Sequence, residues 1–185
     1  MKKWLLMAVV IAVSWWWLHQ PRGPEILADG YIRQGDYRIT VLQPDFHLTA
    51  RILSREDYFL GREADLSPLD LALGWGPMAE AEIYSQFSIR QSNRWYYWRT
   101  DHLPIAQREV ETHSANMHMI PAGPLVAGQL QALRQHQLIE LRGRLVRVDA
   151  GDGWHWVSSL TRNDTGQGAC ELVLVDAVSV IADGS

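Results

Sequence analysis

Residues 154–176, which read WHWVSSLTRNDTGQGACELVLVD, decide the fold class of this chain. Trp154 and Trp156 alternate with polar residues, and this period of two predicts a strand with one buried face. Residues 171–175 are apolar on both faces, which predicts a second and more central strand. A polar connection with two glycines joins the two segments and suits an ordered turn. The stretch therefore indicates antiparallel β structure.

The residues just before this stretch extend the β prediction. Residues 138–148 predict a strand with a bulge at Gly143, because the apolar face changes side there. Residues 149–153 are rich in glycine and aspartate and suit a hairpin loop. Residues 138–180 are therefore expected to form a three-stranded antiparallel meander.

The N-terminal half adds strands and short helices. Residues 37–53 predict a hairpin that turns at residues 43–45, and residues 67–74 predict a short helix with a serine N-cap and a proline in its first turn. Further helices are expected to begin at Pro104 and Pro124. The fold class that we predict is mainly β (α+β). Its expected architecture is a small antiparallel, partly open β-barrel, similar to an OB-fold, with short helical insertions.

Residues 94–99, which read RWYYWR, form a strand candidate in which arginines flank an aromatic cluster. Exposed aromatic rings beside arginine can stack on sugars or bases. Packing of the strand on both faces inside a sheet is the alternative, since strands are generally rich in aromatic residues. The sequence leaves both interpretations open.

The composition argues against an electrostatic nucleic-acid binder. Hydrophobic residues make up 47% of the 185 residues, which is enough for one domain to bury a core. The formal net charge is −4, and both lysines lie at the start of the chain, at Lys2 and Lys3. A nucleic-acid-binding domain normally carries a basic excess, which this chain lacks.

The first 19 residues predict an uncleaved signal anchor. Lys2 and Lys3 precede an apolar run at residues 4–18, which is the pattern of an export signal and is nearly long enough to span a bilayer. Tryptophans at positions 15–17 occupy the place where a cleavage site needs small residues, and indole rings favour the membrane interface. The alternative is a cleaved signal peptide and a soluble exported protein.

The remaining chain is expected to form a linker at residues 20–30 and a single domain at residues 31–182. The predicted location is the bacterial inner membrane, crossed once, with the domain in the periplasm. The expected partners are the membrane and another envelope protein. Cys170 is the one cysteine, so the fold must rest on its core without an internal disulfide.

Two polar stretches are the candidate binding site of an extracytoplasmic binding or scaffold domain. We expect both to be loops, and we expect recognition residues to lie where a rigid sheet holds polar loops. This interpretation involves no cofactor and no metal. The candidate binding residues are His113, Asn116 and His118 in the first loop, and Arg162, Asn163 and Asp164 in the second, which extends to Gly168.

An enzyme of the cell envelope is the alternative function. Cys170 is then a nucleophile with His113, His118 or His155 as its base. The order of a histidine loop, a helix, strands and a cysteine resembles sortases, although no arginine follows Cys170. A metal held by histidines, with His102 and His155 completing the set, is a further possibility, but a spacing of five between His113 and His118 does not suit one helix face.

Four longer stretches together resemble a family of uncharacterised bacterial proteins with an N-terminal membrane segment. They read LSREDY at residues 53–58, DLSPLDLALGWGPM at 65–78, HSANMHMIPA at 113–122 and SSLTRNDTGQGACE at 158–171. The resemblance spans nearly all of the expected exported part. It implies that the four stretches belong to one domain, and it implies no particular activity.

Overall fold

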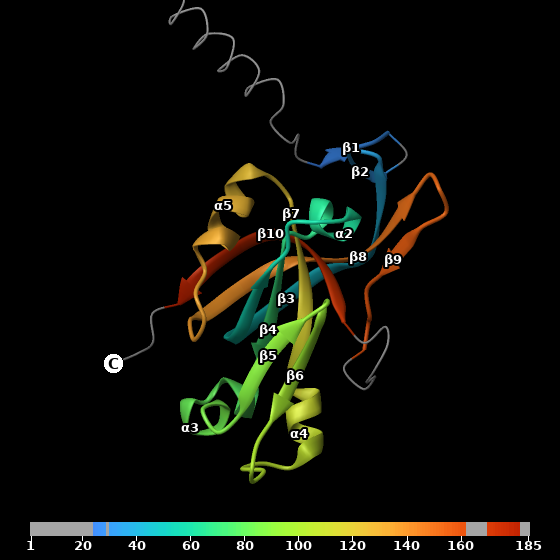
Figure 1. Ribbon diagram of the computed structural model, residues 1–185. Coiled ribbons are helices and arrows are strands. Elements are labelled where there is room, and N and C mark those ends of the chain that lie inside the picture. The colour runs from blue at the N-terminus through green and yellow to red at the C-terminus, as the bar shows by residue number, and fades with distance from the viewer. Residues whose placement is uncertain (1–23, 29, 162–169, 182–185) are drawn as a thin grey trace, which may run out of the picture.

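The computed structural model describes residues 24–28, 30–161 and 170–181. The predicted membrane segment, residues 20–23 and 29 of the predicted linker, and the second polar loop at residues 162–168 lie outside the described residues. Within the described part, no helix is both long and apolar enough to cross a membrane. The domain is mainly β, as predicted, with short helices between the strands (Figure 1).

The strands and helices have the following bounds. The strands are β1 (Glu25–Ile26), β2 (Ile32–Gln34), β3 (Tyr37–Asp57), β4 (Leu69–Gly74), β5 (Ser88–Ser92), β6 (Trp95–Arg99), β7 (Ser114–Pro121), β8 (Leu138–Ala150), β9 (His155–Val157) and β10 (Glu171–Ile181). The helices are α2 (Arg62–Leu66), the 3-10 helix η1 (Gly76–Ala79), α3 (Ala81–Tyr84), α4 (Gln107–Thr112) and α5 (Pro124–Ala132).

Eight strands form one mixed sheet in the order β1-β2-β3-β4-β7-β10-β8-β9, and β5 and β6 form a separate hairpin. Strand β3 also pairs with β8, so the pairings β3-β4-β7-β10-β8-β3 form a closed circuit. All pairings in this circuit are antiparallel except that of β7 with β10, which is parallel. Strand β1 falls within the residues that we expected to be a linker.

The hairpin predicted for residues 37–53 is wrong, because these residues belong to the single long strand β3. Its first part pairs with β8, and its last residues, from Arg51 to Asp57, pair with β4. The predicted turn falls where the register against β8 shifts, between Val41 and Phe46. Pro44 lies in this irregular stretch, where a missing N–H costs little. The turn signal therefore marks a bend in a strand.

The helix predicted for residues 67–74 is also wrong, because Leu69 begins strand β4. Every residue of β4 is buried. The serine that resembled an N-cap instead donates a hydrogen bond from Oγ to the carbonyl oxygen of Leu69, 3.2 Å away. Burial between two neighbouring strands outweighs local capping signals, since packing decides strand formation more than propensity does.

The loop predicted around residues 113–118 is a strand instead. Strand β7 begins at Ser114 and lies between β4 and β10. The expected meander is corrected as well, because β8 lies between β9 and β10 and β10 pairs in parallel with β7. The bulge expected at Gly143 is found beside it, since the register of β10 shifts opposite this residue. The two helices expected after Pro104 and Pro124 are confirmed as α4 and α5.

The buried side chains form three hydrophobic clusters. Leu71 of β4 and Met117 of β7 belong to the main core, which α5 covers through Val126 and Leu130. A second cluster lies around β2, β8 and β10. The third contains Ala72 of β4 and is covered by the inner face of the β5–β6 hairpin. Because side chains alternate along a strand, the face of β4 opposite the main core points toward this hairpin (Figure 1).

Candidate functional site

A buried polar cluster lies on the face of β4 and β7 that points away from the main core. Asp70 of β4 and Asn116 and His118 of β7 are 0%, 1% and 3% exposed. The register of the two strands pairs Asp70 with His118 directly. Buried polar groups are expensive unless they are partnered, so their contacts decide what the cluster does.

The carboxylate of Asp70 is the centre of the cluster. Its Oδ1 accepts a hydrogen bond from Nη1 of Arg94 at 2.7 Å. Its Oδ2 accepts one from Nδ2 of Asn116 at 3.2 Å. The Nδ1 of His118 lies 2.9 Å from the same Oδ2, which is ion-pair range without the alignment of a hydrogen bond. The carboxylate of Asp70 is therefore contacted by three side chains, those of Arg94, Asn116 and His118.

Arg94 reaches this carboxylate from the turn of the β5–β6 hairpin. Asn93 and Arg94 are the two residues between the strands, and both have positive φ, of 52° and 68°. This is the geometry of a two-residue hairpin turn matched to the twist of the strands. A positive φ costs roughly 1–2 kcal/mol for a residue such as arginine. The contacts of Arg94 offset that cost.

Those contacts fix both the backbone and the side chain of Arg94. Its backbone N–H donates to the hydroxyl of Tyr58 at 2.8 Å, and its Nη1 also donates to the carbonyl oxygen of Ser67 at 2.9 Å. Its guanidinium lies 3.7 Å from the centre of the Tyr58 ring and 5.5 Å from that of Trp156. The Trp156 ring in turn packs against His118, with 4.6 Å between ring centres.

The cluster also binds the strands of the hairpin. Nε2 of Gln91 donates to Oδ1 of Asn116 at 2.6 Å, and Nδ2 of Asn116 donates to the carbonyl oxygen of Arg94 at 3.0 Å. The hydroxyls of Tyr96 and Ser114 lie 2.9 Å apart. These contacts tie the hairpin to β7. Asp70, Arg94 and Asn116 thus hold two parts of the fold together, whereas Nδ1 of His118 forms no hydrogen bond with the described residues.

The site residues predicted from the sequence lie in different parts of the structure. Asn116 and His118 belong to the cluster. His113 follows helix α4, where its Nδ1 lies 2.9 Å from the carbonyl oxygen of Glu109 and its ring packs against Gly76. Arg162, Asn163 and Asp164 lie outside the described residues, so the two predicted polar stretches are not brought together by anything that the structure describes.

Cys170 lies just before β10 and is half-buried. Burial raises the pKa of Tyr96, its hydrogen bond with Ser114 lowers that pKa, and the electrostatic effect of Cys170 raises it. In the described part of the chain, no group of three or more histidine, cysteine, aspartate or glutamate residues is placed to hold a metal ion. His102 and His155 are exposed.

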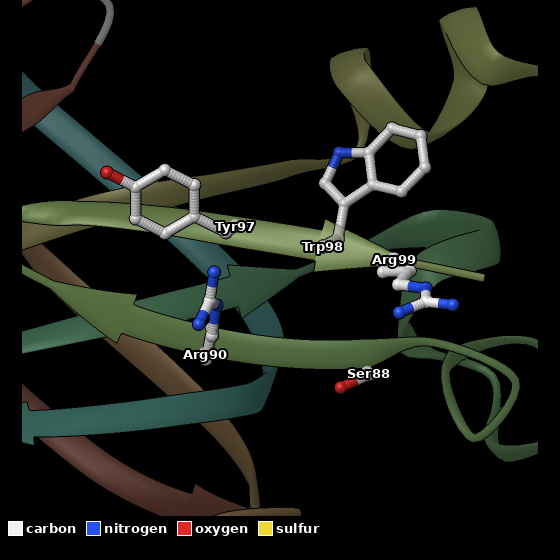
Figure 2. A pocket seen from close by; sticks show the side chains of 5 residues that line it. All are labelled: Ser88, Arg90, Tyr97, Trp98 and Arg99. Atoms are coloured by element: carbon white, nitrogen blue, oxygen red, sulfur yellow. The ribbon is translucent and has the colours of Figure 1, made fainter.

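The outward face of the β5–β6 hairpin is a second candidate site. It contains Tyr97 and Arg99 of the aromatic stretch that the sequence offered as a stacking surface, together with Ser88 and Arg90, which the sequence did not single out. A pocket of about 310 Å³ opens there. Figure 2 shows its lining side chains on the two strands, with Arg90 reaching toward Tyr97. The lining residues are Ser88, Arg90, Tyr97, Trp98 and Arg99. The sequence signal for this shared face is the alternation of side chains along each strand, which places Ser88 and Arg90 on one face of β5 and Tyr97 and Arg99 on the same face of β6.

The two arginines of this pocket differ from most other arginines in the described structure. Arg55, Arg94 and Arg144 are typical of the others, because each contacts an aspartate. Neither Arg90 nor Arg99 forms an ion pair with a carboxylate among the described residues. Both side chains are exposed. The pocket therefore presents two exposed positive charges that form no ion pair with the described residues.

The chain was also compared with known proteins. No protein-family model, no curated protein and no solved structure matches it.

Proposed function

We propose that this chain is a membrane-anchored extracytoplasmic binding domain that presents the outward face of the β5–β6 hairpin to its ligand. The observation that carries the proposal is the pair of exposed guanidiniums, Arg90 and Arg99, which have no acidic partner among the described residues. Arginine is well suited to bind anionic groups through its planar fork of donors. The buried cluster around Asp70 supplies the rigidity, since it fixes the turn of the hairpin.

The fold supports the choice of the hairpin. We infer that the circuit β3-β4-β7-β10-β8 closes into a small barrel of the OB type, because β3 pairs with strands at both ends of the circuit. OB-folds bind ligands on the face of their second and third strands. The corresponding strands here are β4 and β7, and the β5–β6 hairpin inserted between them covers that face. The hairpin's own outer surface then takes over the exposed position.

The location in the cell envelope is part of the proposal and is supported by the sequence. Two lysines followed by the apolar residues 4–18 are typical of a signal anchor, and bulky tryptophans replace the small residues that cleavage requires. The first described strand, β1, begins at Glu25, so a short connection would join the domain to the membrane.

Site-specific photo-crosslinking in living bacteria tests the proposed function. Tyr97 is replaced by p-benzoylphenylalanine in the full chain, and cells are irradiated. We expect an adduct that disappears when Arg90→Gln and Arg99→Gln are added. The control is the same replacement at Leu125 of α5, which is 77% exposed but outside the pocket. Equal labelling at positions 97 and 125, or none at 97, would contradict the proposal.

A cysteine enzyme is the second candidate, and the contact between His118 and Asp70 is what favours it. A carboxylate beside an imidazole is a common element of catalytic sites, and Oδ2 of Asp70 lies 2.9 Å from Nδ1 of His118. The test is the rate at which Cys170 reacts with a small alkylating reagent across pH, with elemental analysis for metal on the same sample. A fast reaction with an apparent pKa well below the free-thiol value of about 8.5 supports the enzyme. A slow reaction and no metal support the binding domain.

A further inference from the structure

The hairpin pocket offers three kinds of functional group, which are guanidinium, aromatic ring and hydroxyl. These groups indicate the class of ligand, and this inference rests on the proposed function. We propose that the pocket binds a uronic acid, a sugar whose ring carries a carboxylate. Arg90 and Arg99 would bind the carboxylate, Tyr97 would pack against the sugar ring, and the Ser88 hydroxyl would bond to a ring hydroxyl. Each assignment follows from the placement of these side chains.

The register of the hairpin places the backbones of the two arginines close enough together for both side chains to reach one carboxylate. Arg90 pairs with Tyr97 across the hairpin, and Ser88 pairs with Arg99. Arg90 and Arg99 are therefore diagonal neighbours on one face, a spacing of roughly 7–8 Å between Cα atoms. Side chains as long as arginine span this distance easily. Two guanidinium forks around one carboxylate give short, charge-assisted hydrogen bonds with fixed geometry.

Tyr97 supplies a flat apolar surface beside that charge. It is 47% exposed, and the guanidinium of Arg90 lies 5.5 Å from its ring centre. The C–H face of a pyranose packs well on an aromatic ring, while the phenol hydroxyl stays available to water or to the ligand. A simple anion such as sulfate would use the arginines and leave this surface unused. The pairing of charge with a ring therefore favours an anionic sugar.

The surroundings of the pocket extend the inference to a chain of sugars. A second hollow of about 290 Å³ shares Ser88 and Arg99 with the first, and Asp101 also lines it. The carboxylate of Asp101 would repel a second anionic group there and would accept hydrogen bonds from the hydroxyls of a neutral sugar. A polysaccharide that alternates a uronic acid with a neutral sugar suits both hollows.

Nucleic acid fits this surface less well. Nucleic-acid binding needs a run of phosphate contacts from basic residues, and the chain as a whole has 21 acidic against 17 basic residues. One pair of arginines with an aspartate nearby matches a single isolated charge better than a phosphate backbone.

Isothermal titration calorimetry on the purified full chain in detergent micelles tests the ligand class. The probes are glucuronic acid, an oligosaccharide that alternates glucuronic acid with a neutral sugar, the matching neutral oligosaccharide, and an aspartate-rich peptide. We expect the mixed oligosaccharide to bind more tightly than the free sugar acid, and the neutral one not to bind. Added salt should weaken binding, because the contact is between exposed charges.

Single variants then locate the binding. Arg90→Gln and Arg99→Gln should each weaken binding by about tenfold, which is the scale of one lost charge-assisted contact. Tyr97→Ala should weaken binding of the oligosaccharide and of glucuronic acid alike. Arg147→Gln is the matched control, since Arg147 is a partly exposed arginine of β8 that pairs with Asp149. It should leave binding unchanged.

Three results would overturn the inference: no binding of the mixed oligosaccharide at millimolar concentration, equal binding of the neutral oligosaccharide, or binding that Arg90→Gln and Arg99→Gln leave unchanged. Arginine-dependent binding of the acidic peptide alone would overturn the ligand class but leave the hairpin as a binding surface. Absence of a crosslink from position 97 in cells would refute the proposed function itself. The two failures are therefore distinguishable.

Discussion

Replacing Asp70 by asparagine should destabilise the protein far more than the same change at an exposed aspartate. The substitution keeps the shape of the side chain and removes its charge. Asp70 is completely buried, and the Arg94 side chain that it pairs with is 17% exposed. Without the carboxylate, the guanidinium of Arg94 stays largely desolvated with no opposite charge beside it.

The size of the effect follows from this burial. Removing one partner of a buried ion pair costs about 3–5 kcal/mol. Arg94 keeps its bond to the carbonyl oxygen of Ser67, its contact with the Tyr58 ring and some access to water. We therefore expect the lower end, about 3 kcal/mol, which is a large part of a typical stability of about 5–15 kcal/mol.

Asp152→Asn is the control, because Asp152 pairs with Arg62 on the surface. The side chains of that pair are 55% and 39% exposed, so the expected loss is much smaller than that of Asp70→Asn. Urea unfolding of the full chain in detergent, followed by tryptophan fluorescence, measures both variants. Hydrogen exchange should rise selectively in β5 and β6 of Asp70→Asn, since their anchor is weakened. Equal losses in the two variants would refute the reasoning.

A double variant separates the ion pair from other effects of the substitution. Arg94→Gln together with Asp70→Asn removes both charges and leaves two neutral amides. Part of the lost stability should return, with a coupling energy of about 2 kcal/mol, within the range for residues in contact. Additive losses would mean that Asp70 stabilises the fold through contacts other than Arg94.

Three further predictions concern stability. Gly143→Ala should cost about 1–3 kcal/mol, because the added Cβ would lie 2.5 Å from the carbonyl oxygen of Leu174, whereas Gly151→Ala meets open space and should be nearly neutral in the same urea assay. Burial raises the pKa of Tyr96, so its neutral form stabilises the fold below the ordinary tyrosine pKa of about 10, and this stability is lost as pH rises through the folded pKa. Ultraviolet titration of the native protein and of Tyr96→Phe should show one late-titrating phenol missing from the variant. A hydrogen bond from the arginine two residues earlier lowers the pKa of Asp149, so its contribution is present above the ordinary aspartate pKa of about 3.9 and is lost as pH falls through the folded pKa. Asp149→Asn should flatten the acid limb of the stability curve, measured by thermal unfolding across pH.

Local features of the fold could be predicted from the sequence. The loop at residues 149–153 and the helix after Pro124 depend on neighbouring residues alone, and both were expected. Pro44 was interpreted as part of a turn and Ser67 as a helix N-cap, which are roles that these residues often have. Tertiary packing places both residues in or beside strands instead. Pro44 lies at a register shift within β3, and Ser67 lies just before a fully buried strand.

The candidate sites were harder to predict because their members come from distant parts of the chain. Asn116 and His118 were recognised as chemically capable, yet Asp70 lies 46 residues before Asn116 and 24 before Arg94. No local sequence pattern predicts a contact between residues so far apart in the chain. Residues 94–99 of the hairpin were recognised as a possible stacking surface, but the alternation of residues along a strand shows only which of them share a face. Whether that face is covered or open depends on the rest of the fold.

The turn of the hairpin joins the two sites into one physical explanation. A two-residue turn of this geometry is most easily made with glycine at its second position, and this chain places Arg94 there with a φ of 68°. Glycine would relieve the strain but would leave Asp70 buried without its guanidinium. The arginine is therefore explained by the cluster beneath it. Because the same side chain fixes the hairpin to β4, it also holds Arg90 and Tyr97 in place on the opposite face. A rigid support reduces the entropy lost when a ligand binds, so the buried ion pair is itself a contribution to binding.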